Sequence, residues 1–278
     1  MDALFAHSPG NEPLVVELLQ EVYRRLGLDY RNYSQTFLSR RITAFARKNN
    51  FDSIDEMVRS LLANERELES FVDSMSLPTT RMFRDPAVFK EIRESVIPML
   101  SETQLAKVWS AGCSTGEEAY SLSIIFKEEQ PGKKIVTFAT DLSERSLHIA
   151  KKGIYQLRRM RAYTAAYLAS GGTADFSDYY TADDENAIIN ADLRGNLVFA
   201  QHNLVIDSTF NEFDLILCRN VLIYFNRALQ EQVVNLLANS LRPGGILILG
   251  DKESIRSMAP RQNFVDLDRT LRIFQKAQ

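Results

Sequence analysis

The sequence has little cysteine and no long apolar run. Its 278 residues include two cysteines, too few for the disulfide framework of a small secreted domain. No apolar stretch approaches the ~18 residues that a membrane-spanning helix requires. Residues 1–13 lack the basic segment and apolar core of a secretion signal. We therefore expect a cytoplasmic protein with no direct membrane insertion.

An excess of charge of one sign is also absent. The formal net charge is −3, with 25% charged and 45% hydrophobic residues. A protein that binds duplex nucleic acid usually carries a strongly basic balance, so this composition argues against that class. The three histidines are scattered, and we expect no metal site. The length suits one large α/β domain with a small companion.

Residues 1–77 have the apolar spacing of helices. Leu14, Leu18, Val22 and Leu26 recur every four residues, and Gly27 follows them as a stop signal. The segment "SIDE" at 53–56 has the Ser-x-x-Glu form of a capping box. We predict a helical N-terminal domain over 1–77, followed by a linker around Pro78, which cannot continue a helix.

From residue 106 onward, apolar strands alternate with helices. The strands are predicted in "AKVWSAG", "KIVTFATD", "NLVFAQH", "FDLILCR", "GILILGD" and "TLRIF". Such alternation predicts a mostly parallel sheet with helices on both faces, in a domain over 78–278. The alternation breaks at 163–196, which mixes helix, turn and short-strand patterns. We predict an inserted subdomain there.

Polar residues follow four of these strands. Gly112 to Glu118 follow the first, Asp141 the second, Asn203 the third, and Arg219 with Asn220 the fourth. In a doubly wound sheet the carboxyl ends of the strands share an edge, and ligands bind where the strand order reverses. The sequence therefore predicts a binding site at this edge.

The loop "AGCSTGEE" at 111–118 does not suit a phosphate. It has no lysine for a P-loop, and its glycines are four residues apart, a poor match to G-x-G-x-x-G. A nucleoside that is positively charged and lacks phosphate suits the loop better, and S-adenosylmethionine is such a ligand. Each of Glu117 and Glu118 either contacts the ligand or only complements the helix dipole. Asp141 can accept hydrogen bonds from ribose hydroxyls, cap the next helix, or do both.

The segments "WSAGCSTGEEAYSLSI", "ATDLSERSLHIAKKGIY" and "FDLILCRNVLIYF" resemble the CheR-type glutamate methyltransferases of bacterial chemotaxis receptors. "TRMFRD" and "LRPGGILILGDKES" fit the same family, so the resemblance covers nearly the whole chain. It implies a Rossmann-like class I methyltransferase fold, with an N-terminal all-helical domain and a small β-rich inserted subdomain. It also implies methyl transfer from S-adenosylmethionine to glutamate side chains on receptor coiled coils.

The resemblance carries over a set of site residues. It implies that Thr80 and Arg84 lie at the methionine end of the cofactor and at the reaction centre, and that Gly112 lines the same end. Glu118, rather than Glu117, matches the acid that contacts the cofactor. It places Asp141 on the ribose and Asn203 and Leu204 beside the adenine, while Arg219 and Asn220 complete the pocket. Tyr224 corresponds to a tyrosine beside the transferred methyl group, and Arg84 and Tyr224 are therefore the expected catalytic residues.

The chain departs from the family pattern at two positions. Pro78 stands where members commonly have a cofactor-contacting Asn, and Met82 replaces a Phe. Proline has no donor, so one cofactor contact is lost or moved, whereas the methionine is a tolerable apolar exchange. The insertion is also shorter than in members that bind a receptor tether peptide, and we expect no tether.

The expected chemistry needs no general base. A glutamate with a pKa of ~4.3 is already a carboxylate at neutral pH, so alignment is the main task of the site. Arg84 could bind either the substrate carboxylate or that of the cofactor. For Cys113 and Cys218 we expect a structural role.

A basic helix face is predicted in "SQTFLSRRITAFARKNN" at 34–50. At ~100° per residue, a single stripe holds Arg40, Arg41, Arg47 and Lys48. Such a face suits steering toward an acidic receptor coiled coil, although it is also compatible with an ordinary solvated surface.

Three other functions are compatible with parts of this pattern. A non-catalytic binder would use the same fold to sense the cofactor. A nicotinamide dehydrogenase is disfavoured by the loop chemistry, and a nucleic-acid methyltransferase would have an Asn/Asp-Pro-Pro-aromatic loop where this chain has "CRNVLIYF".

Overall fold

A computed structural model describes residues 12–75, 79–100, 105–258, 261 and 263–277. It forms two compact units. The first is Met1–Leu77 with Leu222–Val233, and the second is Pro78–Val221 with Val234–Gln278. Pro78, which departs from the family pattern, lies outside the described residues. In the described residues, no helix has both the length and the apolarity needed to cross a membrane.

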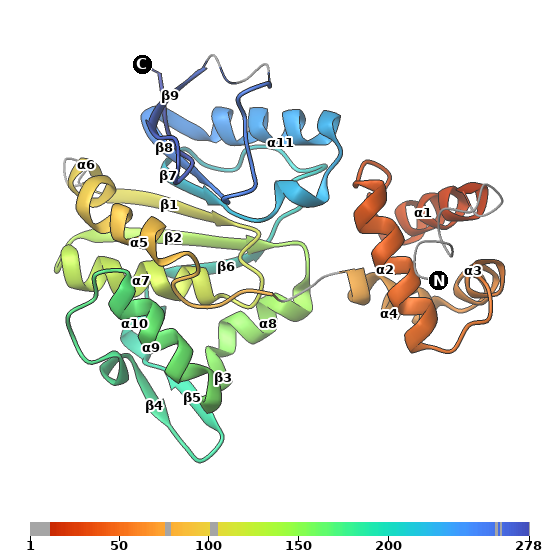
Figure 1. The fold of residues 1–278 in the computed structure, drawn as a ribbon, viewed down its shortest axis with the longest axis horizontal. Helices are drawn as coiled ribbons and strands as arrows, with labels where there is room; N and C mark the ends of the chain where they lie inside the picture. The colour runs from red at the N-terminus through yellow and green to blue at the C-terminus, as the bar shows by residue number, and fades with distance from the viewer. Residues whose placement is uncertain (1–11, 76–78, 101–104, 259–260, 262, 278) are drawn as a thin grey trace. The chain divides into compact units, whose positions relative to one another are not determined.

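The first unit is helical in its N-terminal part, as the apolar spacing predicted. Its helices are α1 (Glu12–Leu26), α2 (Gln35–Lys48), α3 (Ile54–Ala63) and α4 (Glu65–Met75) (Figure 1). Gly27 follows α1 with a φ of +69°, a value that glycine tolerates without strain. The capping box is present: Glu56 N donates to Ser53 Oγ at 3.1 Å, while the Glu56 carboxylate accepts from Asp52 N at 2.9 Å.

A later part of the chain returns to this unit. The short helix η4 (Leu222–Tyr224) and the start of α11 (Arg227–Ser240) belong to it. Ser34 N donates to Tyr224 O at 2.8 Å, and the rings of Phe37 and Tyr224 lie 5.0 Å apart. The apolar run "VLIYF" therefore supplies aromatic side chains to the helical unit.

The second unit is built on a seven-stranded sheet. Its strands are β1 (Leu105–Ala111), β2 (Lys134–Asp141), β6 (Leu197–Gln201), β7 (Phe213–Cys218), β8 (Leu241–Leu249), β9 (Phe264–Asp268) and β10 (Ile273–Lys276). The order is β6-β2-β1-β7-β8-β10-β9, and the first five are parallel. The strand β10 is antiparallel to both of its neighbours. This confirms the predicted Rossmann-like class.

The strand order reverses between β1 and β7. From β1 the chain moves outward through β2 to β6, then crosses back to β7 and β8. The helices α7 (Glu117–Glu129) and α8 (Glu144–Lys152) follow β1 and β2 and pack against β2 and β6. Because β1 and β7 are parallel neighbours, their carboxyl ends meet at the reversal, where a ligand is expected.

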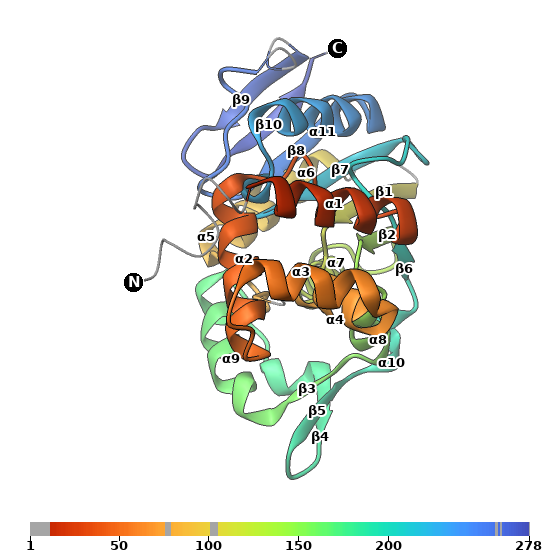
Figure 2. The ribbon, with the colours of Figure 1, turned by 90° about the vertical axis from the view of Figure 1, so that its right-hand side faces the viewer.

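A second, three-stranded sheet lies apart from the main one in both views (Figures 1 and 2). It comprises β3 (Ile154–Gln156), β4 (Tyr180–Ala182) and β5 (Asn186–Ile189), with β5 in the middle. Around it are η2 (Leu157–Arg159), α9 (Met160–Ala169), η3 (Phe176–Tyr179) and α10 (Ala191–Arg194). Its first strand precedes the predicted boundary at residue 163, because three residues are too few to show an alternating pattern.

Charged and phenolic side chains tie this subdomain to α7 and to the segment before β1. The segment before β1 forms α5 (Pro86–Glu91), η1 (Ile92–Val96), a π-helical turn, and α6 (Ile97–Leu100). The Arg93 guanidinium on η1 lies 2.6 Å from carboxylate oxygens of both Glu128 and Glu129. Glu128 also accepts hydrogen bonds from Tyr167 and Tyr179 of the subdomain. Arg93 thus pairs with two carboxylates at the end of α7, and one of them, Glu128, also accepts hydrogen bonds from the subdomain.

Replacing Arg93 by alanine should lower the free energy of unfolding by about 3 kcal/mol, because it leaves partly buried carboxylates without their cation. Denaturant unfolding followed by circular dichroism measures the change. Lys90→Ala, which removes an exposed partner 3.8 Å from Glu94, is the control and should stay within about 0.5 kcal/mol of the parent. Equal effects of the two variants would contradict this account.

Candidate functional site

The turn after β1 requires two glycines. Gly112 has a φ of +75°, and a Cβ there would lie 2.5 Å from Val221 Cγ2. Gly116 has a φ of +91°, and its N–H donates to Cys113 O at 3.0 Å. The backbone therefore turns sharply, and Gly116 caps α7. Glycine alone allows both the positive φ and the close approach at residue 112.

Asp141, the last residue of β2, braces this turn. One carboxylate oxygen accepts from Ser114 N at 2.8 Å and the other from Ser143 N at 2.9 Å. Ser143, not Asp141, caps α8, since its hydroxyl accepts from Ser146 N. The alternative role of Asp141 as a helix cap is therefore wrong. Burial raises the pKa of Asp141, although backbone N–H donors oppose that rise.

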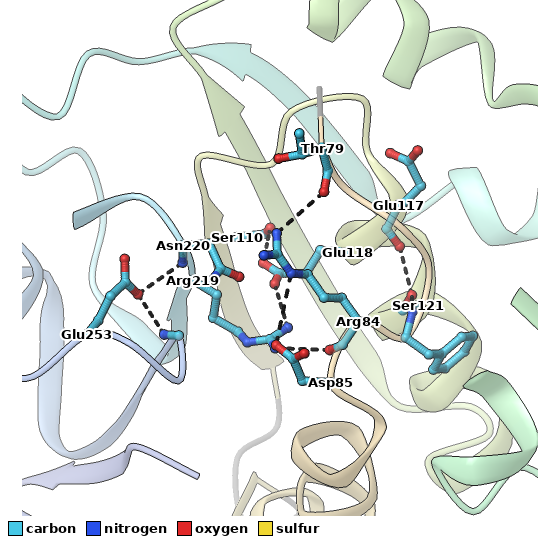
Figure 3. A network of polar contacts seen from close by, with 12 residues as sticks. Thr79, Arg84, Asp85, Ser110, Glu117, Glu118, Ser121, Arg219, Asn220 and Glu253 are labelled. Atoms are coloured by element: carbon cyan, nitrogen blue, oxygen red, sulfur yellow. Dashed lines mark hydrogen bonds and ion pairs between the residues drawn. The ribbon is translucent and has the colours of Figure 1, made fainter. Parts of the chain in front are cut away.

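Glu118 belongs to a network at the strand reversal (Figure 3). Its carboxylate accepts from Ser110 Oγ at 2.8 Å and from Arg219 Nη1 at 3.2 Å. The Arg219 side chain is 1% exposed, and its Nη2 donates to Asp85 Oδ2 at 2.7 Å and to Arg84 O at 2.9 Å. Arg219 thus joins the segment before the sheet to the start of α7.

Arg84 lies in a turn that is held from both sides. Phe83 N donates to Ser121 Oγ at 2.8 Å, and Arg219 holds the backbone and carboxylate that follow. The guanidinium of Arg84 itself is loosely held: Nη1 lies 3.5 Å from Thr79 O, and Nε lies 4.0 Å from Asp85 Oδ2. Its side chain is 32% exposed.

Strained backbone is concentrated in these segments. In the described ranges, the site segments contain most of the non-glycine residues with positive φ, namely Phe83, Asp85, Ser114 and Asn220. Such conformations cost of order 1–3 kcal/mol each and persist only where the surroundings enforce them. The hydrogen bonds just described supply that enforcement at Phe83, Asp85 and Ser114.

A residue missed by the sequence reasoning organises the end of β7. The buried carboxylate of Glu253 accepts from Asn220 N at 2.9 Å, Val221 N at 2.8 Å and Gly250 N at 2.6 Å (Figure 3). An acidic residue just after the fifth parallel strand was a signal that could have revealed it. Asn220 Oδ1 is buried and accepts no hydrogen bond from the described part of the chain.

The loop after β6 carries the two residues expected beside the adenine. Asn203 Oδ1 accepts from Val205 N at 2.9 Å, and Asn203 N donates to Asp207 Oδ2 at 2.7 Å. Asn203 and Leu204 are both buried. This loop therefore closes on its own side chains at the same edge of the sheet as Asp141.

Glu117 does not join this group. It is fully buried, and its carboxylate points away from Glu118 (Figure 3). It accepts from Thr115 Oγ1 at 2.6 Å and from the Tyr163 hydroxyl at 3.3 Å. Glu117 lies in the first turn of α7, a position that suits the helix dipole. Its carboxylate is used by Thr115 and Tyr163.

The remaining expected residues differ in their surroundings. Thr80 is half-buried in the segment before Arg84. Tyr224 belongs to the first unit, where its ring lies 5.0 Å from that of Phe37 on α2. Cys113 and Cys218 are free and buried, and burial raises the pKa of both thiols. These two thiols are therefore poor nucleophiles.

The assembled groups fit S-adenosylmethionine. The sulfonium and ammonium are cations, and Glu118 and Asp141 supply carboxylates. Asn220 Oδ1 is a buried acceptor with no donor among the residues that the structure describes, and an ammonium would supply one. Asp141, which already binds backbone N–H groups, keeps lone pairs for ribose hydroxyls. Gly112 gives the turn below these groups its positive φ and lets Val221 pack against the backbone.

A mostly parallel sheet with this reversal, a glycine turn after β1 and an acidic residue at the end of β2 are typical of Rossmann-like folds that bind a nucleoside cofactor, and the antiparallel β10 suits the class I methyltransferases. Family models match in both units: "CheR methyltransferase, SAM binding domain" over residues 78–271 and "CheR methyltransferase, all-alpha domain" over 16–76. The chain belongs to the CheR methyltransferase family, and it is an enzyme that uses S-adenosylmethionine.

Relatives agree along nearly the whole chain. The protein Cher3 of Pseudomonas putida is 40% identical over 260 residues, covering 94% of this chain and 95% of its own. A chemotaxis protein methyltransferase of Listeria innocua is 34% identical over 245 residues, covering 86% of this chain and 88% of its own. Another, from Pseudomonas aeruginosa, is 30% identical over 246 residues, covering 83% and 86%.

Lowering the pH should weaken cofactor binding through Asp141. Burial raises its pKa in the free protein, whereas hydroxyl donors of a ribose would favour the carboxylate, so binding releases a proton. Affinity for S-adenosylhomocysteine should therefore fall as the pH drops through this raised pKa. Calorimetry between pH 7.5 and 5 measures the trend.

Asp141→Asn should bind at least ~10-fold more weakly at pH 7.5 and should lose most of the pH dependence. Asp183→Asn is the matched control, since Asp183 also accepts two backbone N–H groups but lies in the turn between β4 and β5. An unchanged pH profile in Asp141→Asn would exclude Asp141 as the linked group.

Proposed function

We propose that this enzyme transfers the methyl group of S-adenosylmethionine to glutamate side chains on the cytoplasmic helices of chemoreceptors. The products are glutamyl methyl esters, formed in chemotaxis adaptation or related chemosensory signalling. The names of several relatives, chemotaxis protein methyltransferases of Listeria and Pseudomonas, support this assignment. The chemistry of the site supports a carboxylate acceptor.

The observation that carries the proposal is the guanidinium of Arg84. It is partly exposed, is held only at 3.5 Å and 4.0 Å by its neighbours, and lies in a turn fixed by Arg219. A guanidinium in a fixed turn with weak internal partners can bind an incoming carboxylate in two-pronged fashion. Such a group suits an acceptor that is itself a carboxylate.

The histidines support an acceptor that needs no deprotonation. His202 is buried, and its Nε2 lies 3.3 Å from Ser208 O, while His148 is exposed on α8. His7 lies outside the described residues. A glutamate with a pKa of ~4.3 is ionised without a base, whereas a protonated amine or a hydroxyl nucleophile has to lose a proton.

When bound, the cofactor supplies an electrophilic methyl group on a sulfonium. The protein's residues have the task of placing a carboxylate oxygen in line with it and excluding water. Holding the reactants in this geometry can contribute ~7–11 kcal/mol. In this proposal Arg84 orients the carboxylate of the substrate or of the cofactor, and Tyr224 lies beside the transferred methyl.

Each remaining residue has a proposed part in holding the cofactor. Its methionine end is held by Thr80, Gly112, Glu118 and Asn220, with Arg219 acting through Glu118. The ribose is bound by Asp141. The adenine lies between Asn203 and Leu204, in the loop that the hydrogen bond to Val205 N closes.

We further propose that the helical domain over 1–77 recognises the receptor through α2. Arg40, Arg47 and Lys48 are exposed on this helix. Arg41 is only half-buried, and its Nη1 lies 3.5 Å from Ser74 O of the same unit, so it contributes less to the surface than its spacing predicted. The three exposed cations suit an acidic coiled coil.

Incubation with radiolabelled S-adenosylmethionine and receptor-containing membranes should label a membrane protein in a form that alkali releases as methanol. Methyl esters hydrolyse under alkali, whereas methylated nitrogen does not. Membranes that lack receptors are the control and should remain unlabelled. Label that survives alkali would exclude a carboxylate acceptor.

The same assay with Arg84→Met tests the residue that carries the proposal. Labelling should fall about 100-fold, because the carboxylate loses its orienting cation, while Asp183→Asn should label like the parent. Retention of full labelling in Arg84→Met would remove Arg84 from the mechanism. A non-catalytic binder would give no label with any variant.

Reversing Arg40 and Arg47 together to Glu should lower kcat/KM for receptor methylation at least ~5-fold at low salt, because steering toward an acidic partner is lost. The difference should shrink at high salt. Reversing Arg59 and Arg66, exposed cations of α3 and α4, is the control with the same change in net charge. Equal slowing by both pairs would show that net charge, not α2, matters.

A further inference from the structure

The turn that begins the cofactor site is held by the inserted subdomain as well as by the sheet. The Tyr155 hydroxyl, on β3, donates to Thr115 O at 2.7 Å. The Tyr163 hydroxyl, on α9, donates to Glu117 Oε1 at 3.3 Å. Both tyrosines are buried. One tyrosine hydroxyl from the small sheet thus binds the turn at Thr115, and one from α9 binds Glu117, the first residue of α7.

A glutamate at position 117 carries a high desolvation cost. It is fully buried, and burial raises the pKa of its carboxyl group. An apolar side chain would avoid that desolvation cost. The carboxylate instead accepts from Thr115 within the turn, at 2.6 Å, and lies 3.5 Å from the Arg159 guanidinium of the subdomain. Its hydrogen bonds join the turn to α9.

Gly116 is closely packed, with no space for a side chain. A Cβ there would lie 2.8 Å from Ala150 Cβ and 3.3 Å from the Tyr155 hydroxyl. Ser114, two residues earlier, is held by Asp141 at 2.8 Å. The turn is therefore held at Ser114 by Asp141 of β2 and at Thr115 by Tyr155 of the subdomain, while Ala150 of α8 packs closely on Gly116.

We propose that Tyr155, Tyr163 and Glu117 are positioning residues, here called the loop clamp, that hold the turn at 113–116 in its cofactor-binding conformation. The clamp acts through Thr115 and Gly116 and touches no substrate. It gives the inserted subdomain a part in cofactor affinity. By linkage, a bound cofactor that orders the turn also stabilises the subdomain's side of the clamp.

Calorimetric titration of S-adenosylhomocysteine into the full-length protein tests the clamp. Tyr155→Phe removes one hydrogen bond to the turn and should raise Kd about 5- to 10-fold. Glu117→Gln should have an effect of similar size. Tyr179→Phe is the matched control, because the Tyr179 hydroxyl bonds Glu128 at the far end of α7 and not the turn. Its Kd should stay within twofold of the parent.

Thermal unfolding of the same proteins separates positioning from general stability. Tyr155→Phe and Tyr179→Phe each lose one buried hydroxyl bond and should lower Tm by similar amounts, yet only the first should change Kd. Tyr163→Phe, which loses the longer bond, is the milder variant if Tyr155→Phe does not fold. Hydrogen exchange at residues 113–116 should become faster in the clamp variants and remain parental in Tyr179→Phe.

The proposal is overturned if the clamp variants lower Tm without changing Kd, or if Tyr179→Phe weakens binding as much as they do. None of these measurements uses a methyl acceptor. Their outcome therefore stands whether or not the acceptor is a receptor glutamate.

Discussion

The site depends on one buried guanidinium. Arg219 follows β7 at the reversal of strand order, and its side chain is 1% exposed. It donates to a carboxylate of α7, Glu118, and to the backbone and carboxylate of the turn that carries Arg84. Three segments that are far apart in the sequence are thus fixed by one planar group with several donors. Without it, two carboxylates and a strained turn would lack their common partner.

Much of the sheet and its edge could be predicted because few physical rules determine them. Continuous apolar strands separated by helices indicate a parallel sheet, and parallel strands end at the same edge, so Gly112, Asp141 and Arg219 had to converge. The contacts of Glu253 could not be predicted in the same way. Its partners are backbone N–H groups, whose directions depend on loop conformations that no periodicity reveals.

Other features could not be predicted because they depend on contacts distant in sequence. The spacing of α2 placed Arg41 on an exposed stripe, but Ser74 on another helix accepts from it. The spacing of α7 could not show which of two adjacent glutamates faces the cofactor edge, since that depends on Tyr163 and Arg159 in the insertion. Helix periodicity locates a side chain around its own axis, whereas the neighbouring elements decide what it contacts.

The pairing of Glu118 with Arg219 also bears on the rate of the proposed reaction. A sulfonium and a carboxylate are charged, whereas the ester and thioether they form are neutral, so charge decreases on the way to the transition state. An unpaired carboxylate beside the sulfonium would stabilise the reactants more than the transition state and would slow the transfer. Glu118 is paired at 3.2 Å, and Asp141 is partly neutralised by backbone N–H donors. These carboxylates therefore act as directed hydrogen-bond acceptors with little excess negative charge. In the proposed reaction, such acceptors bind the cofactor without stabilising the charged reactants much more than the transition state.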